Sequence, residues 1–213
     1  MTSELFSRLD RIIAQCDDGL RTLFAPAPVG RENPAKSVAD VDLVDADRQL
    51  SARLMRVNHA GEVCAQALYR GQAATTQTPG VREKLAQSAA EENDHLAWTE
   101  ARINELGSHT SYLNPIWYAG SLTIGALAGL AGDKWSLGFV AETERQVVAH
   151  LSGHLTRLPA RDQASRAVLE QMCKDEGHHA TVAIEAGAAP LPTIACRLMR
   201  LTAKIMTRTA YWI

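Results

Sequence analysis

The chain has 213 residues, which is long enough for one domain with a substantial core, whereas two small domains are less expected. Apolar residues make up 46% and aromatic residues 5%, a composition that favours helix over sheet. The net charge of −2 lacks the basic excess of nucleic-acid-binding proteins, so no nucleic-acid partner is expected. The four cysteines contain no C-x-x-C pair, which argues against a zinc ribbon or disulfide scaffold and favours a reduced, intracellular protein.

Residues 1–47 are predicted to form an N-terminal part that precedes the main domain. Six apolar residues recur there at helical spacing: Leu5, Leu9, Ile12, Cys16, Leu20 and Leu23. They predict an amphipathic helix over 3–24. The three prolines of "APAPVGRENPAKSVAD" predict an extended or mobile linker after it. The first residues lack the basic start and apolar run of a secretory signal, and no role follows for this part.

Residues 48–213 are predicted to form one all-α domain, since no strand-like alternation occurs in them. Helices are expected over about 45–75, 79–106, 133–158, 160–187 and 192–211, with an apolar, glycine-rich segment at 114–132. Asp45 or Asp47 is the expected cap of the first helix, and Thr78 caps the second. Helices of about 25 residues are about 38 Å long. That length suits a four-helix bundle.

Two Glu-x-x-His pairs lie on the second and fourth helices of this expected bundle. They are Glu92 with His95 and Glu176 with His179. Residues three apart are neighbours on one helix face, so each pair presents a carboxylate and an imidazole to the same point. Glu92 is preferred to Glu91 because only Glu92 has a histidine three residues further on.

The second pair has one alternative frame. Asp175 and His178 are also three residues apart, but Gln171 lies on their side of the helix. Glu176 and His179 instead share their face with small or apolar residues: Met172, Cys173, Ala180 and Ala183. These apolar neighbours predict that Glu176 and His179 point inward. Asp175 and His178 remain the alternative pair.

One further carboxylate is predicted on the helix before each pair. These are Glu62 and Glu144, and the separations Glu62 to Glu92 and Glu144 to Glu176 are 30 and 32 residues. Glu144 is preferred to Glu142 because it shares its face with four apolar residues: Val140, Val147, Val148 and Leu151. The near-equal separations predict a duplicated helix pair, in which each half donates Glu plus Glu-x-x-His.

Four carboxylates and two imidazoles are the ligand set of ferritin-like di-iron and di-manganese bundles. Buried carboxylates without cations cost several kcal/mol each, whereas two divalent ions balance their charge. Oxygen and imidazole donors suit iron or manganese, while thiolates would have indicated zinc or an iron–sulfur cluster. The predicted metal ligands are therefore Glu62, Glu92, His95, Glu144, Glu176 and His179.

Three further histidines are weaker candidates. His59 lies one turn before Glu62, and His150 and His154 lie one turn apart on the third bundle helix. They are candidates for outer hydrogen-bond donors to the metal ligands. The alternative is that they are ordinary surface or hydrogen-bonded core residues.

Two segments indicate contact with a membrane surface. The last helix, 192–211, has an apolar side and a basic side and is followed by aromatic residues, which fits a helix in the membrane interface. The segment 114–132 has no charge, and Trp117, Tyr118 and Trp135 flank its apolar run as interfacial aromatics do. Its glycines permit close helix packing. We expect the protein to lie on a membrane, not across it, and to receive a lipid-soluble substrate there.

With these residues in place, the chain over 48–213 resembles the demethoxyubiquinone hydroxylases of ubiquinone biosynthesis, in their bacterial form. The resemblance rests on "RVNHAGEVCAQALYRGQ", "EENDHL", the glycine-rich segment, "VAETERQVVAHL" and "DEGHHATVAIEAGA". In that family the glutamate of "HAGE" is an iron ligand, which matches Glu62. The family's two E-x-x-H motifs and later glutamate match the other five predicted ligands.

The resemblance implies O2-dependent hydroxylation of the quinone ring of a polyprenyl demethoxyubiquinol. It implies two iron ions per chain, with O2 and an electron donor, NADH or a separate reductase, as co-substrates. A peripheral location on the cytoplasmic face of the cell membrane is expected. Other ubiquinone-biosynthesis proteins and a second copy of the chain are the expected partners besides the quinol.

Two rival functions use the same residues differently. An iron-handling protein of the ferritin or rubrerythrin kind would store iron or reduce peroxide with these ligands. It would not need the glycine-rich segment or the basic, aromatic-ended tail. A helical membrane-interaction module would carry the acidic and histidine residues incidentally, and metal analysis separates that case.

Overall fold

The computed structural model describes residues 8–39 and 41–213, and these are all-α, with no strand. The first helix is α1 (Arg8–Phe24), followed by the short 3-10 helix η1 (Pro34–Ser37). The longer helices are α2 (Asp45–Thr75), α3 (Pro79–Glu105), α4 (Asn114–Leu130), α5 (Asp133–Arg157), α6 (Gln163–Glu185) and α7 (Thr193–Ala210). The predicted all-α fold is confirmed.

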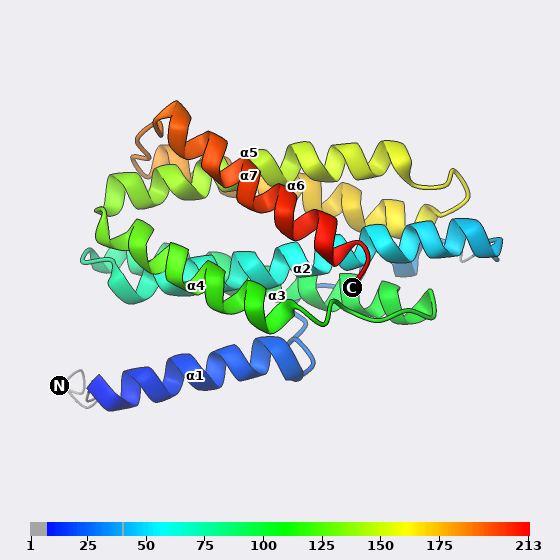
Figure 1. Cartoon of the computed structure of the whole chain (residues 1–213), viewed down its shortest axis with the longest axis horizontal. Coiled ribbons are helices and arrows are strands. Elements are labelled where there is room, and N and C mark those ends of the chain that lie inside the picture. The colour runs from blue at the N-terminus through cyan, green and yellow to red at the C-terminus, as the bar shows by residue number, and fades with distance from the viewer. Residues whose placement is uncertain (1–7, 40) are drawn as a thin grey trace.

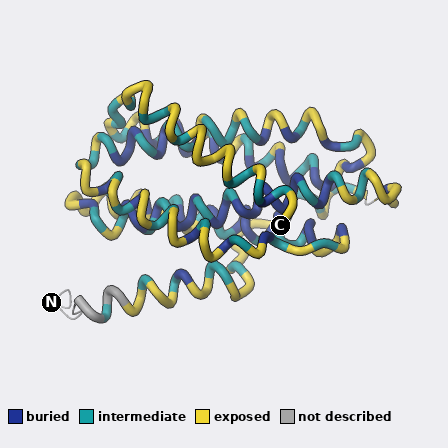
Figure 2. Tube along the Cα trace, viewed as in Figure 1, coloured by how far each residue is buried: buried dark blue, intermediate teal, exposed yellow. Residues whose placement is uncertain are grey.

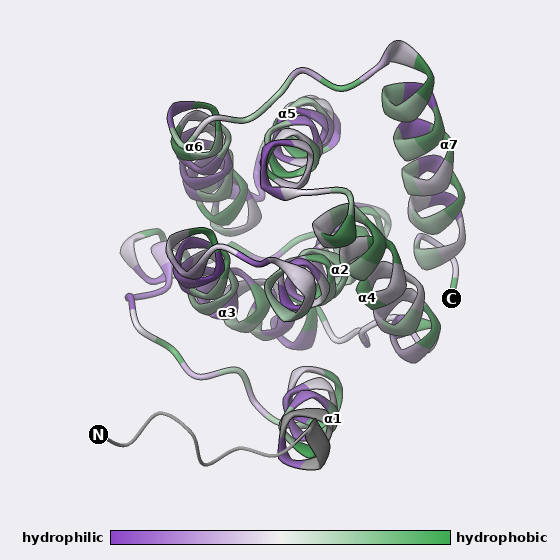
Figure 3. Ribbon diagram, turned by 90° about the vertical axis from the view of Figure 1, so that its left-hand side faces the viewer, coloured by the Kyte–Doolittle hydropathy of each residue, from purple (hydrophilic) through white to green (hydrophobic). Residues whose placement is uncertain are grey.

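Four of these helices, α2, α3, α5 and α6, form the predicted ferritin-like bundle. Seen end-on, α5 and α6 lie above α3 and α2 as two helical hairpins (Figure 3). Short connections join the helices within each hairpin, at Thr76–Thr78 and at 158–162. The connection between the hairpins is long and contains α4. Each hairpin carries one half of the predicted ligand set.

The bundle core consists of two apolar clusters with a polar layer between them. One cluster contains Leu54, Trp98, Leu151 and Leu169, one residue from each bundle helix. Further along the same helices, the other cluster contains Ala65, Leu85, Val140 and Ala183. The predicted metal ligands fall between these positions on every helix. Figure 2 shows the buried residues along the inner faces of the bundle.

The glycine-rich helix α4 packs along the outside of α2, as its small residues predict. A Cβ atom on Gly125 would collide with the backbone carbonyl oxygen of Leu68, so only glycine allows this approach. The hydroxyl of Thr75 donates to the carbonyl oxygen of Ala126 at 3.0 Å. Within the described residues, no helix has both the length and the apolarity needed to span a membrane.

Helices α1 and α7 lie outside the bundle. α7 runs across the face that also carries α4, while α1 packs against α2 and α4 on another side, near its own C-terminal end (Figures 1 and 3). Ala210 is the buried residue of α7. Its exposed apolar residues are Ile194, Leu198, Leu201 and Ile205.

Several sequence-based expectations need correction. Asp45 is the first residue of α2 and not its cap, because Val44 occupies the N-cap position. Thr78 does hold the N-cap position of α3, yet its side chain makes no capping hydrogen bond. The predicted linker contains η1. Tyr118 is buried in the core and is no interfacial residue. Leu5 of the predicted first helix lies outside the described residues.

Candidate metal centre

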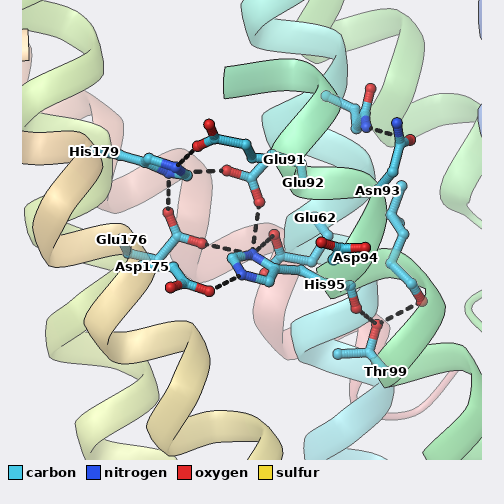
Figure 4. A network of polar contacts seen from close by, with 12 residues as sticks. Glu62, Glu91, Glu92, Asn93, Asp94, His95, Thr99, Asp175, Glu176 and His179 are labelled. Atoms are coloured by element: carbon cyan, nitrogen blue, oxygen red, sulfur yellow. Dashed lines mark hydrogen bonds and ion pairs between the residues drawn. The ribbon is translucent and has the colours of Figure 1, made fainter. Parts of the chain in front are cut away.

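The six predicted ligands meet inside the bundle, and each is at most 6% exposed. α2 contributes one, α3 two, α5 one and α6 two: Glu62, Glu92, His95, Glu144, Glu176 and His179. Sequence periodicity therefore selected six residues that share one buried layer. Figure 4 shows five of them as sticks between α3, α6 and α2.

Both imidazoles direct Nδ1 into this layer. His95 Nδ1 lies 2.8 Å from Glu92 Oε2, 3.1 Å from Glu176 Oε1 and 3.7 Å from Glu62 Oε2. His179 Nδ1 lies 3.2 Å from Glu176 Oε2 and 3.3 Å from Glu92 Oε1. Glu92 and Glu176 thus lie between the two rings and face both of them. The two halves of the site share their carboxylates across the bundle axis.

The candidate ligand atoms are close enough to share a metal ion. One ligand atom from each of Glu62, Glu92, His95 and Glu176 lies within 4.8 Å of the others, a group that could hold a metal ion. Glu144 lies beside Glu176 and accepts a hydrogen bond from the hydroxyl of Tyr69 at 2.5 Å. Tyr69 is buried on α2, and the sequence analysis did not single it out.

Each imidazole is held on its outer side by a carboxylate from the opposite hairpin. His95 Nε2, on α3, lies 2.9 Å from Asp175 Oδ2 on α6. His179 Nε2, on α6, lies 2.7 Å from Glu91 Oε2 on α3. Such outer partners fix the tautomer and ring orientation of a metal-ligating histidine. Because Nε2 is occupied in this way, Nδ1 is the nitrogen left for a metal.

Glu91 and Asp175, which helical periodicity ranks below Glu92 and Glu176 as ligands, lie on the outer sides of the two imidazoles. His178, which the alternative pair combines with Asp175, is exposed. The available signal was that an acidic residue directly precedes each Glu-x-x-His motif. Its meaning depends on the opposite helix, and so periodicity within one helix did not reveal it.

The choice of Glu144 over Glu142 agrees with the geometry. Glu144 is 1% exposed and lies in the polar layer. Glu142 lies away from it, where its Oε1 accepts from Gln146 Nε2 at 2.7 Å and lies 3.7 Å from Arg200.

The three weaker histidine candidates are buried or half-buried, but they do not form hydrogen bonds with the six predicted ligands. Within the described part of the chain, neither His59 nor His150 forms a hydrogen bond with any of them. His154 Nδ1 instead lies 2.8 Å from Asn58 Oδ1, and its ring packs against that of His150. Burial lowers the pKa values of His59 and His150 to about 4 and the pKa of His154 to about 3. With these pKa values all three rings are neutral at pH 7.

The electrostatics of the polar layer favour cations. Burial, together with the charges of Glu92 and Glu176, raises the pKa values of Glu62 and Glu144. Burial opposes protonation of His179, yet its carboxylate neighbours raise its pKa to about 12. The pKa of His95 is also raised by its carboxylate neighbours, against the effect of burial. Protons thus offset part of the carboxylate charge, and metal binding must displace them.

The donor set fits hard or borderline divalent ions. Glu92 Oε1 and Glu176 Oε1 are buried, and each faces an imidazole across the layer: Glu92 Oε1 lies 3.3 Å from His179 Nδ1, and Glu176 Oε1 lies 3.1 Å from His95 Nδ1. Buried carboxylates of this kind are costly unless positive charge balances them. Carboxylate oxygens and imidazole nitrogens are donors that suit divalent ions such as iron or manganese.

Comparison with known proteins places this geometry in a family. The family model described as "Ubiquinone biosynthesis protein COQ7" matches residues 49–212. The chain belongs to the COQ7 family. A "3-demethoxyubiquinol 3-hydroxylase" of Nitrosococcus oceani is 56% identical over all of both chains. Proteins of the same name from Nitrosospira multiformis and Aromatoleum aromaticum are each 56% identical, over 96% and 95% of this chain and 99% and 98% of theirs.

These relatives confirm the predicted family and the prediction that the COQ7 chain is an enzyme, an oxidoreductase of the hydroxylase type. The relatives also align with N-terminal residues that precede the segment matched by the family model. The Nitrosococcus relative aligns over the full chain, including residues 1–48. The N-terminal extension is therefore shared with the Nitrosococcus relative.

Proposed function

We propose that this COQ7 protein hydroxylates the quinone ring of a polyprenyl demethoxyubiquinol in an O2-dependent reaction at a di-iron site. The observation that carries the proposal is the meeting of four carboxylates and two imidazoles in one buried layer. The name shared by the relatives favours a hydroxylase over an iron-storage or peroxide-reducing protein.

Glu62, Glu92, His95, Glu144, Glu176 and His179 would hold the two ions. Iron bound there would supply the activation of O2 that ring hydroxylation requires. The chain's own part is to fix and insulate the site. Asp175 and Glu91 orient the two imidazoles, and Tyr69 orients Glu144. The apolar clusters on either side of the layer exclude water, which limits side reactions of a reactive centre.

A lipid-soluble quinol needs a route from the membrane to this layer. We place the protein on the cytoplasmic face of the cell membrane, with α4 and α7 against it, because both carry exposed apolar residues on one face of the molecule. A cavity of about 510 Å³ opens between α7, α5 and α2, with His150 and Tyr211 in its wall. His150 is six residues from Glu144, about 9 Å along α5. This cavity is the proposed entrance for the quinol head.

The proposal is tested with iron-loaded protein, a demethoxyubiquinol analogue, a reductant and O2. The wild-type protein should bind about two irons per chain and form the hydroxylated product. Glu144→Gln should bind iron at least about ten-fold more weakly, since even the loss of an outer partner costs 10–100-fold in metal affinity. Glu142→Gln, the matched control outside the polar layer, should retain iron and activity.

Iron content and product formation are measured on the same preparations. Absence of iron from carefully reconstituted wild-type protein would refute the proposed centre. Retained iron without hydroxylation of any demethoxyubiquinol analogue would refute the proposed reaction.

A further inference from the structure

The linker after α1 is bound to the bundle beside the metal centre. The backbone N–H groups of Gly30 and Arg31 donate to Asp94 Oδ1, at 2.7 and 3.1 Å. Asp94 lies on α3 next to His95 and is 5% exposed. A linker that only joined two parts would have no need of a buried carboxylate that receives two of its N–H groups. We call residues 25–39 the strap.

The side chain of Arg31 spans the gap between α3 and α6. Its Nε lies 2.8 Å from Asp94 Oδ2, and its Nη1 lies 2.9 Å from Asp175 Oδ2. The guanidinium carbon is 4.9 Å from the centre of the Trp98 ring, within cation–π range. Three contacts from one planar fork fix the guanidinium in place, an arrangement that the single ammonium of lysine cannot reproduce.

Asp175 links Arg31 to the metal centre. The same oxygen that meets Arg31, Oδ2, lies 2.9 Å from His95 Nε2, and Oδ1 accepts from Gln171 Nε2 at 2.9 Å. Arg31, Asp175 and His95 therefore form a continuous chain of polar contacts. These contacts lead from the strap to Nε2 of His95, while Nδ1 of the same ring faces the carboxylates of the polar layer. Figure 4 shows the contact between Asp175 and His95.

The other imidazole has no such support. Glu91, the outer partner of His179, has a side chain that is 41% exposed. Besides His179, Glu91 contacts Gln87, whose Nε2 donates to Oε1 at 3.0 Å, and within residues 8–39 and 41–213 no Lys or Arg pairs with it. The duplicated halves of the site are thus unequal. One outer carboxylate is neutralised by Arg31, and the other faces water.

The positive charge of Arg31 should affect the two oxidation states of a bound metal differently. A carboxylate that shares its oxygen with a guanidinium has less negative charge to offer the imidazole, so it makes the histidine a weaker donor to metal. A fixed positive charge at this point also disfavours the more highly charged, oxidised metal, and partial burial limits its screening. Loss of Arg31 should therefore stabilise the oxidised form.

We propose that Arg31 is a positioning residue of the metal centre, because through Asp175 it holds the imidazole of His95 in place. It also makes the electrostatic surroundings of His95 different from those of His179. The inference rests on the proposed di-iron site. It gives the N-terminal extension a function, since the strap delivers to the centre a residue that lies outside the matched family model.

The test compares full-length wild-type protein with Arg31→Gln, Arg31→Lys and a control, Arg48→Gln. The side chain of Arg48 is exposed to the same extent as that of Arg31, 42% against 43%, but it pairs at 3.2 Å with the fully exposed Asp42 and does not contact the six candidate ligands. Each protein is loaded with ⁵⁷Fe. Mössbauer spectra report the two iron environments, and a redox titration gives the midpoint potential. Circular dichroism confirms folding.

Wild-type protein should show two resolved ferrous doublets. In Arg31→Gln one doublet should change while the other stays, and the potential should fall by about 59 mV, a ten-fold shift toward the oxidised form for a one-electron couple. Arg31→Lys keeps the charge without the fork, so its potential should stay near that of wild type while the same doublet changes. Arg48→Gln should match wild type. If Arg31→Gln does not fold, the doublet in Arg31→Lys decides the question.

Unchanged doublets and potential in folded Arg31 variants would overturn the inference while leaving the proposed function intact. A change of both doublets together would also overturn it, because the effect would not be confined to the iron beside His95. Wild-type protein that binds no iron would overturn both proposals.

Discussion

At the scale of single residues, charge in the bundle is arranged in pairs that cross between hairpins. The inner carboxylates of Glu92 and Glu176 face both imidazoles. The outer carboxylates of Asp175 and Glu91 each meet the imidazole from the opposite helix. Breaking one partner of a buried ion pair costs several kcal/mol. The polar layer therefore holds the two hairpins in register and keeps the six candidate ligands together.

Buried neutral histidines outside the layer predict acid sensitivity. The folded-state pKa of His59 is lowered to about 4 by burial, whereas the unfolded chain protonates near 6.5. Below pH 6.5 the unfolded state thus binds the proton and the folded state does not. This contribution to the unfolding free energy should fall as the pH drops from 6.5 to 4, by at most about 1.4 kcal/mol per pH unit.

Urea unfolding of the metal-free protein at several pH values measures this slope. His59→Gln removes the titrating group, so its unfolding free energy should fall less steeply between pH 6.5 and 4 than that of wild type. The comparison of the two slopes removes the contribution of His95 and His179, which both proteins share. Equal slopes would contradict the assignment of a buried, neutral His59.

At the scale of helices, backbone contact between α2 and α4 depends on glycine. A Cβ on Gly71 would meet the carbonyl oxygen of Leu122, and one on Gly125 would meet that of Leu68. Reciprocal glycines of this kind bring two helices closer than side chains normally allow. The close approach attaches α4 firmly to the bundle, while four large apolar residues on its other side stay exposed: Ile116, Ile124, Leu127 and Leu130.

Alanine substitutions within α4 should separate this packing from helix propensity. Gly125→Ala should destabilise the protein by about 1–3 kcal/mol, because backbone must move to admit the methyl group. Gly120→Ala, where the new Cβ meets nothing within 4 Å, should be neutral or stabilise by up to about 1 kcal/mol. Thermal and urea unfolding measure both. Similar effects of the two substitutions would contradict the close packing of α2 and α4.

At the scale of the whole molecule, one face combines α4 and α7 (Figures 1 and 3). On α7 the exposed apolar residues stand beside exposed basic ones: Arg197, Arg200, Lys204 and Arg208. An apolar row with basic neighbours suits the surface of an anionic bilayer.

Membrane binding is therefore predicted to depend on α7. Wild-type protein should sediment with anionic liposomes, and the double variant Leu198→Ser/Leu201→Ser should bind at least about ten-fold more weakly. Val41→Ser/Val44→Ser removes exposed apolar side chains from the segment just before α2 and serves as the control. It should bind like wild type. Failure of wild-type protein to sediment, or equal losses in both variants, would contradict the proposed face.

The sequence by itself determined the helices and which of their faces turn inward. Helical periodicity is a local property, so the apolar neighbours of Glu144 and Glu176 were enough to predict that they point inward. The tertiary structure decided what these residues meet. The crossed partners of His95 and His179, the burial of Tyr118 and the contact of Arg31 with Asp175 all join segments far apart in the chain. No spacing within one helix encodes such contacts, because they depend on how the helices and the strap pack together.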